Sequence, residues 1–225
     1  YLLKSVDGKY YTLDEYKEKI AANQTNKDSK VVALYASDEK EQHSFIETAK
    51  NREYDVVVLD SPLTSHLVSK LEQKMENFSF ARVDADTIDK LIEKDENLPS
   101  KLSEDEQKAI QPLIEDSVEK EKFNVQFESM SEKDQPMIIT QSEFMRRMKE
   151  QQMTGGGNMF GAMPEMYNLV VNSNHPLIGE IVSESDETKK KELISQIVDL
   201  AMLSQNMLKG EALSKFIKRS VDLIK

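Results

Sequence analysis

The chain has 225 residues, enough for two modest domains, and its formal net charge of −11 at pH 7 disfavours nucleic acid and membrane as partners, because both are polyanions that attract basic proteins. It contains no cysteine, which excludes disulfides, thiolate metal sites and cysteine nucleophiles and suits a reducing compartment. No apolar run approaches the roughly 20 residues of a membrane-spanning helix, and the chain begins with neither an initiator methionine nor a signal-peptide pattern, so we expect a piece of a longer protein.

The first hundred residues predict strands that alternate with helices. Thr12, followed three residues later by Glu15, forms a capping box for a helix that begins near Leu13. Buried strands are expected at 31–36, 54–59 and 78–83, and helices at 39–51 and 63–75. The order βαβαβ, with strands apolar along most of their length, predicts a small α/β layer domain with a largely parallel sheet covered on both faces.

Polar residues follow two of these strands, where sheets of this kind often carry ligands. Ser37 and Asp38 follow the first strand, and Asp60, Ser61 and Pro62 follow the second. No glycine there allows the backbone to approach a phosphate closely, and the carboxylates would repel one. We therefore interpret these residues as helix caps, and a nucleotide-dependent enzyme built on this domain is disfavoured.

Between residues 87 and 105 the sequence becomes polar and charged, and a domain boundary is expected there. Ser103 and Glu106 form a second capping box, ahead of a helix to about Lys122 in which Pro112 either introduces a kink or starts a second turn. Strands are expected at 123–127, 136–140 and 167–171, and helices at 187–208 and 211–224, separated at Gly210. The second domain is thus predicted to be α+β, a three-strand sheet with helices.

Eight of the 11 methionines fall between residues 130 and 166. In this window Phe144, Met145, Met148 and Gln152 recur at three- and four-residue spacing, so they share one face of a short amphipathic helix. Arg146, Arg147 and Lys149 are expected on the flanks of that face, and Thr154 with three consecutive glycines predicts a flexible loop after it. We interpret the helix as an exposed, adaptable apolar surface, with a helix buried in a core as the alternative.

Copper(I) binding is a different function that this window suggests, because thioether sulfurs are soft ligands. The methionines concerned are Met145, Met148, Met153, Met159, Met163 and Met166. Copper-binding methionine motifs usually need an oxidising compartment and help from histidine, and the window contains no histidine. The methionine-rich copper protein therefore remains the second hypothesis, which a copper(I) titration would distinguish from a peptide-binding surface.

The last two predicted helices carry more apolar surface than two helices can cover. The apolar band of 187–208 is too broad for one neighbour, and apolar residues of 211–224 repeat at three and four. A two-fold partner with the same pair would close a four-helix bundle, and the alternative is packing onto the sheet of the same chain. The residues expected in such a dimer interface are Leu193, Ile197, Leu200, Ala201, Leu213, Phe216, Ile217, Val221 and Ile224.

Several of these segments resemble the heat-shock protein 90 family of molecular chaperones, in its bacterial form. The resemblance rests on 135–140, the methionine-rich helix, Asn172 to Ile178 and 200–224, and upstream on 12–20 and 54–62. It implies that residues 1–98 are the end of the family's middle domain and residues 99–225 its C-terminal domain for dimerisation and client contact. It further implies a homodimer whose client-binding residues are Phe144, Met145, Met148 and Met153, with unfolded or partly folded proteins as clients.

The same resemblance places the family's ATP and Mg site, and the residues that promote hydrolysis, before Tyr1. We therefore expect no catalysis and no cofactor in this fragment. The residues agree, because His43, His66 and His175 are dispersed and no serine lies in a nucleophile motif. His175 is interpreted as a turn residue. The end of the chain has neither the acidic tail of eukaryotic cytosolic members nor an endoplasmic-reticulum retention signal, so a bacterial cytoplasmic protein is expected.

Overall fold

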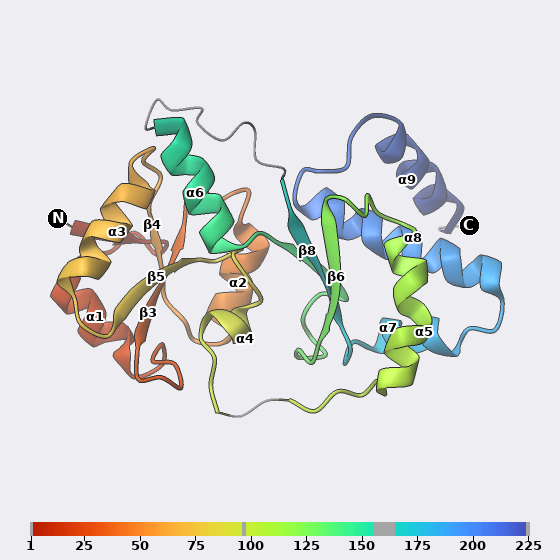
Figure 1. Cartoon of the computed structure of the whole chain (residues 1–225), viewed down its shortest axis with the longest axis horizontal. Coiled ribbons are helices and arrows are strands. Elements are labelled where there is room, and N and C mark those ends of the chain that lie inside the picture. The colour runs from red at the N-terminus through yellow and green to blue at the C-terminus, as the bar shows by residue number, and fades with distance from the viewer. Residues whose placement is uncertain (1, 96–97, 155–164, 224–225) are drawn as a thin grey trace. The chain divides into compact units, whose positions relative to one another are not determined.

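The computed structural model describes residues 2–95, 98–154 and 165–223, with 149–154 and 223 described by their backbone only (Figure 1). Its contacts divide the chain into two compact units. Unit 1 comprises Tyr1–Glu96 and Gln141–Pro164, and unit 2 comprises Asn97–Thr140 and Glu165–Lys225. The predicted mixed α/β content is confirmed, whereas the predicted methionine-rich helix, expected within the second domain, groups with unit 1.

Unit 1 contains a five-stranded sheet in the order β2-β1-β4-β3-β5. The strands are β1 (Leu2–Ser5), β2 (Tyr10–Thr12), β3 (Val31–Ala36), β4 (Val56–Val58) and β5 (Phe78–Arg82). As predicted, β3 pairs in parallel with β4 and β5. Strands β1 and β2 were not predicted; they form a short hairpin that adds antiparallel strands beside β4, through a turn with Gly8 at a φ of 79°. Strands of four and three residues are too short to show an alternating pattern.

Three helices of unit 1 follow the predicted order: α1 (Leu13–Ala21), α2 (His43–Asn51) and α3 (Thr64–Lys74). The short helix α4 (Ile88–Leu91) lies where a polar domain boundary was expected and was not predicted. The Thr12 and Glu15 capping box is present at the start of α1. The expectation that Asp38 caps a helix from residue 39 was wrong. Its carboxylate instead accepts from the amides of Lys40 and Glu41 at 2.8 and 3.0 Å, which holds a separate turn before α2 begins at His43.

Both faces of this sheet are covered, with α1 and α3 on one side and α2 and α4 on the other (Figure 1). Alternate residues of a strand point to opposite faces, so β3 supplies side chains to both layers. The layer under α1 and α3 contains Leu3, Tyr16, Ile20, Val31, Ala33, Tyr35, Val57, Leu59, Val68, Phe78 and Phe80. Because every residue of β3 is buried, the strand reads as a continuous apolar run.

Unit 2 is built around β8 (Tyr167–Asn172), the central strand of a three-stranded sheet. It pairs in parallel with β6 (Phe123–Glu128) and antiparallel with β7 (Met137–Thr140). The helices of this unit are α5 (Glu104–Glu115), α7 (Pro176–Ser183), α8 (Glu187–Ser204) and α9 (Gly210–Leu223). Their buried side chains and those of the sheet form one core, which includes Ile114, Val125, Leu169, Ile181, Ile194 and Ile197.

Two helix boundaries in unit 2 differ from the prediction, and one helix was not predicted. The helix after Ser103 ends at Glu115 with Pro112 inside it, not near Lys122. Helix α8 ends at Ser204, because Asn206 adopts a φ of 54° and the chain turns before α9. Helix α7 was missed: His175 is not a simple turn residue, since its Nδ1 accepts from the amide of Leu177 at 3.1 Å and so caps this helix.

Candidate functional site

The methionine-rich helix α6 (Glu143–Thr154) is attached to unit 1 by its charged side. Arg146 is only 5% exposed, and it donates to the hydroxyl of Tyr35 on β3 and, at 2.7 Å, to Oε1 of Glu143. The hydroxyl of Tyr35 also lies 3.1 Å from that carboxylate oxygen. The first turn of α6 is therefore fixed to β3 by a buried cluster of charged and polar groups.

Arg147 extends this cluster to α3 and β5. Its guanidinium donates to the two carboxylate oxygens of Glu72 at 2.9 and 3.3 Å and to Oε1 of Glu143 at 2.6 Å. It also donates to the backbone carbonyl of Phe80 at 2.8 Å, while the Phe80 amide donates to Glu72 at 2.8 Å. We call Tyr35, Glu72, Glu143, Arg146 and Arg147 the α6 anchor.

The charges of the α6 anchor balance, two arginines against two glutamates. Burial raises the pKa of Glu143, but the neighbouring Arg146 and Arg147 lower it by more, so this pKa lies below its ordinary value of 4.5. Burial, and then the Glu143 carboxylate, raise the pKa of the Tyr35 hydroxyl. At neutral pH Glu143 is therefore ionised and Tyr35 is neutral. In these forms the Glu143 carboxylate accepts from both arginines, and the Tyr35 hydroxyl donates to that carboxylate.

The apolar side of α6 faces away from the anchor. Residues 143, 146 and 147 share one side by three- and four-residue spacing, and residues 144, 145 and 148 share the other. Phe144 is 70% exposed, and Met145 and Met148 are half-buried. Arg146 and Arg147, expected on the flanks of the apolar face, form the side of the helix that faces unit 1. Met153 lies outside the residues whose side chains are described.

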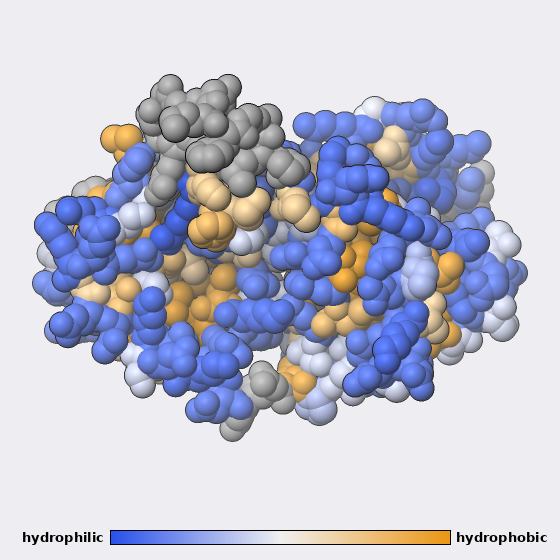
Figure 2. Space-filling model, viewed as in Figure 1, coloured by the Kyte–Doolittle hydropathy of each residue, from blue (hydrophilic) through white to orange (hydrophobic). Residues whose placement is uncertain are grey.

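On the face seen in Figure 2, hydrophilic side chains cover most of the coloured surface, and apolar side chains appear in small groups between them. Exposed large apolar residues elsewhere in unit 1 include Leu63, at 61%. Of the methionines proposed for copper, Met166 is 47% exposed, while Met159 and Met163 lie outside the described residues. No observation supports the copper alternative.

The residues predicted at a dimer interface fall into two groups. Ile197 and Ala201 are buried in the core of unit 2, and Phe216 is only 8% exposed. Leu193 and Leu213 are half-buried, and Ile224 lies outside the described residues. The exposed apolar residues of these helices are Leu200 at 46%, Ile217 at 53%, Val221 at 49%, and Leu203 at 39%, which was not in the predicted set.

Polar contacts fix α9 against α8 and bring these exposed residues together. Arg219 pairs with Asp199, and its Nε donates to Gln196 at 3.2 Å. Gln196 in turn donates to the hydroxyl of Ser220 at 2.9 Å. Residues 196, 200 and 203 share one stripe of α8, and residues 217, 220 and 221 share one side of α9. The exposed apolar residues therefore border the seam where α8 and α9 meet.

The segment Asn172 to His175 is a structural centre of unit 2. Asn172 donates to the carbonyl of Ser131 at 2.8 Å, and Asn174 donates to that of Met130 at 3.1 Å. The Asn174 side chain also accepts from the amide of Lys101 at 2.7 Å. These buried amides therefore join the β6–β7 connection to the segment that precedes α5.

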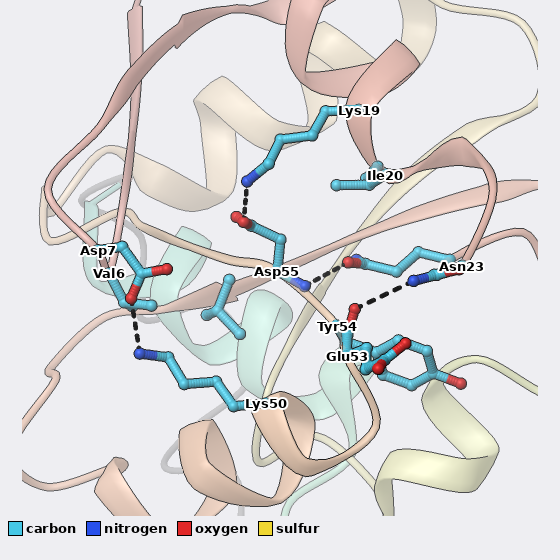
Figure 3. A pocket seen from close by; sticks show the side chains of 11 residues that line it. Val6, Asp7, Lys19, Ile20, Asn23, Lys50, Glu53, Tyr54 and Asp55 are labelled. Atoms are coloured by element: carbon cyan, nitrogen blue, oxygen red, sulfur yellow. Dashed lines mark hydrogen bonds and ion pairs between the residues drawn. The ribbon is translucent and has the colours of Figure 1, made fainter.

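One pocket of about 360 Å³ opens in unit 1, and sequence reasoning did not predict it (Figure 3). Lys19 pairs with Asp55, and Lys50 pairs with Asp7 at 2.7 Å, so carboxylates neutralise the two lysines that line the pocket. Nothing in this lining selects a ligand of particular charge. Among the described residues, no group of three or more His, Asp or Glu side chains could hold a metal ion, and no described helix is long and apolar enough to cross a membrane.

Comparison with known proteins identifies the class to which this fold belongs. The family model described as Hsp90 protein matches residues 2–224, nearly the whole chain. The chain therefore belongs to the Hsp90 family of chaperones.

Its bacterial relatives are named Chaperone protein HtpG. It is 35% identical over 291 residues to those of Bacteroides fragilis (strain YCH46) and Bacteroides thetaiotaomicron, and 36% identical over 292 residues to that of Porphyromonas gingivalis (strain ATCC 33277). These matches cover 99 to 100% of this chain and 43% of each relative. The chain thus spans less than half the length of the relatives it matches.

Proposed function

We propose that the chain is the part of an ATP-dependent chaperone that contacts client proteins and joins two copies of the chaperone. The observation that carries the proposal is the orientation of α6, whose charged side is buried while Phe144 is 70% exposed. A helix that merely completed a core would bury its apolar side instead. In domain terms, residues 1–98 would end the middle domain and residues 99–225 would form the C-terminal domain, with α6 docked on unit 1.

Client contact would be weak and general. Burying a phenylalanine or methionine side chain contributes about 1.5–3 kcal/mol before the costs of association are subtracted. Phe144, Met145 and Met148 therefore supply enough apolar contact to bind an unfolded segment, but too little to prevent its release. Methionine side chains fit surfaces of varied shape, which suits clients without a common sequence.

A pair of single variants tests this proposal. Phe144→Ser removes an exposed side chain from α6, and Leu63→Ser removes a similarly exposed one from elsewhere in unit 1. We expect Phe144→Ser, and not Leu63→Ser, to reduce the ability of the chain to prevent aggregation of a chemically unfolded protein. Equal activity of the two variants, with unchanged thermal unfolding, would refute the assignment to α6.

Dimerisation is proposed through α8 and α9. The seam bordered by Leu200, Leu203, Ile217 and Val221 presents apolar side chains on two packed helices, and a two-fold partner would cover them with its own copy. Ile197, Ala201 and Phe216, which were expected in this interface, would support it from within the core. Sedimentation of the chain at micromolar concentration checks the proposal, and a monomer would contradict it.

Nucleotide chemistry is proposed to lie outside residues 1–225, so that this fragment neither binds ATP and Mg nor hydrolyses ATP. The support is that the first domain lacks a glycine-rich phosphate loop. Calorimetric titration with ATP and Mg checks it, and micromolar binding would contradict it. We also propose a bacterial cytoplasmic location, which the bacterial relatives and the lack of cysteine support.

A further inference from the structure

The strand β5 forms one edge of the five-stranded sheet, and among the strands that the structure describes it pairs only with β3. The carbonyl of Asn77 accepts from Val31, and the amide of Val83 donates to Tyr35. Since peptide groups of a strand alternate in direction, those of Phe78, Phe80 and Arg82 point away from β3. The Arg82 carbonyl accepts from the amide of Ala85 at 2.9 Å, and the rest of this outward row is a template on which another extended chain can pair.

Side chains occupy the centre of this edge. The outward amide of Phe80 donates to Glu72 on α3 at 2.8 Å, and the outward carbonyl of Phe80 accepts from Arg147 on α6 at 2.8 Å. Glu72 and Arg147 are themselves paired, so together they present one acceptor and one donor to the strand. A neighbouring β-strand would offer the same two groups to Phe80.

We propose that the outer edge of β5 accepts an extended segment of a client protein as an additional strand, and that Arg147 holds α6 over this edge until the segment displaces it. The proposal rests on the proposed client-binding function and adds a second way of contact. Main-chain hydrogen bonds would recognise any extended polypeptide, because they do not depend on its side chains. The ligand class is therefore an unfolded or extended peptide.

The same residue joins the two modes of contact. Arg147 satisfies β5 and also fixes α6 to Glu72 and Glu143. Displacing it by a client strand would release the first turn of α6, so that Phe144 and Met148 could move with the client. Apolar contact through α6 is thus compatible with a docked or a free helix, whereas strand addition requires α6 to be released.

The test uses two labelled ten-residue peptides of alternating valine and threonine with terminal lysines. The second peptide is N-methylated at its four central residues, so it lacks donors on both edges but keeps its side chains. Binding to the whole chain and to its Arg147→Ala variant is measured by fluorescence anisotropy. Arg52→Ala is the control, because it removes another arginine–carboxylate pair of unit 1, with Asp89, that does not touch β5.

We expect Arg147→Ala to raise the affinity for the unmethylated peptide by roughly fivefold, the factor that one net competing hydrogen bond contributes. The methylated peptide should show no gain, and Arg52→Ala should bind both peptides as the unchanged chain does. If Arg147→Ala fails to fold, Glu72→Gln weakens the same pair while keeping an oxygen for the Phe80 amide, and it should give a smaller gain of the same kind.

Unchanged affinity in the folded variants, or an equal gain for both peptides, would overturn the strand-addition proposal. If Phe144→Ser still lowers client binding under those results, client contact through α6 stands and only strand addition fails. If neither Arg147→Ala nor Phe144→Ser changes binding, both proposals fail.

Discussion

Arg147 on α6 and Glu72 on α3 form an ion pair in which the guanidinium reaches both carboxylate oxygens, at 2.9 and 3.3 Å. These side chains are 17% and 24% exposed, so the pair is mostly shielded from water. A two-point contact of this kind fixes orientation as well as distance. It explains why α6 keeps its charged side against unit 1 and leaves Phe144 in solvent.

Arg146→Ala should loosen α6 without unfolding unit 2. The substitution removes one hydrogen-bond donor from the buried Glu143 and one from the Tyr35 hydroxyl. Breaking a buried ion pair costs about 3–5 kcal/mol, and we expect the lower end of this range because the cluster is partly exposed. Hydrogen exchange of the amides of 143–148 should become faster. Lys120→Ala, which breaks an exposed pair with Asp116, is the control and should change little. Unchanged exchange in α6 would contradict the anchor.

Acid should release α6. The pKa of Glu143 is lower in the folded chain than its ordinary value of 4.5, so the stabilisation from its charge is fully present above 4.5 and is lost as pH falls through the folded value. We expect α6 amides to exchange faster, relative to those of β8, as pH is lowered below about 4.5. In Glu143→Gln this relative change should disappear. If the Glu143→Gln variant kept the full pH response, that response would belong to another titratable group.

Ile217→Asp should separate the proposed dimer into folded monomers. Ile217 is 53% exposed in the single chain, so a charge there is hydrated in the monomer and buried only by a partner. Sedimentation should show half the mass with an unchanged thermal unfolding temperature.

Phe216→Ala is the matched comparison for that variant. Phe216 is 8% exposed within its own chain, so its truncation should lower the free energy of unfolding by about 3 kcal/mol. It therefore tests folding first and association second. A dimer that survives Ile217→Asp would remove α9 from the interface.

Asn174→Ala should destabilise unit 2 by roughly 2–3 kcal/mol, because it leaves the Met130 carbonyl and the Lys101 amide without their buried partner. Thermal unfolding measures the loss. Asn124→Ala, whose exposed side chain donates at 3.5 Å to Asn168, is the control and should change stability little. Equal effects of the two substitutions would show that Asn174 does not hold the unit together.

Local signals predicted most of the elements. The capping boxes of Thr12 and Ser103 are present, and β3 was predicted to its end residues, because caps and continuous apolar runs are encoded by neighbouring residues. Helix α7 was missed because His175, directly before it, was interpreted as a turn residue. The residues around His175 in the sequence did not indicate that its side chain would cap a helix.

The docking of α6 could not be predicted in the same way. The partners Glu72 and Tyr35 lie 75 and 111 residues before Arg147 and Arg146 in the sequence. Helical spacing separates the charged and apolar sides of α6, but it does not indicate which side meets the protein. Arginines on a helix are usually solvated, and here their burial is stabilised by Glu143 together with groups supplied from elsewhere in the fold, the Glu72 carboxylate, the Tyr35 hydroxyl and the Phe80 carbonyl.

Photo-cross-linking at position 144 tests the central claim most directly, that the outward side of α6 contacts clients. Phe144 is replaced by a photoreactive phenylalanine analogue, and in a second chain Leu63 is replaced by the same analogue. After illumination with a chemically unfolded protein, we predict a cross-linked product from position 144 and little or none from position 63. A product from position 63 with none from position 144 would contradict the account.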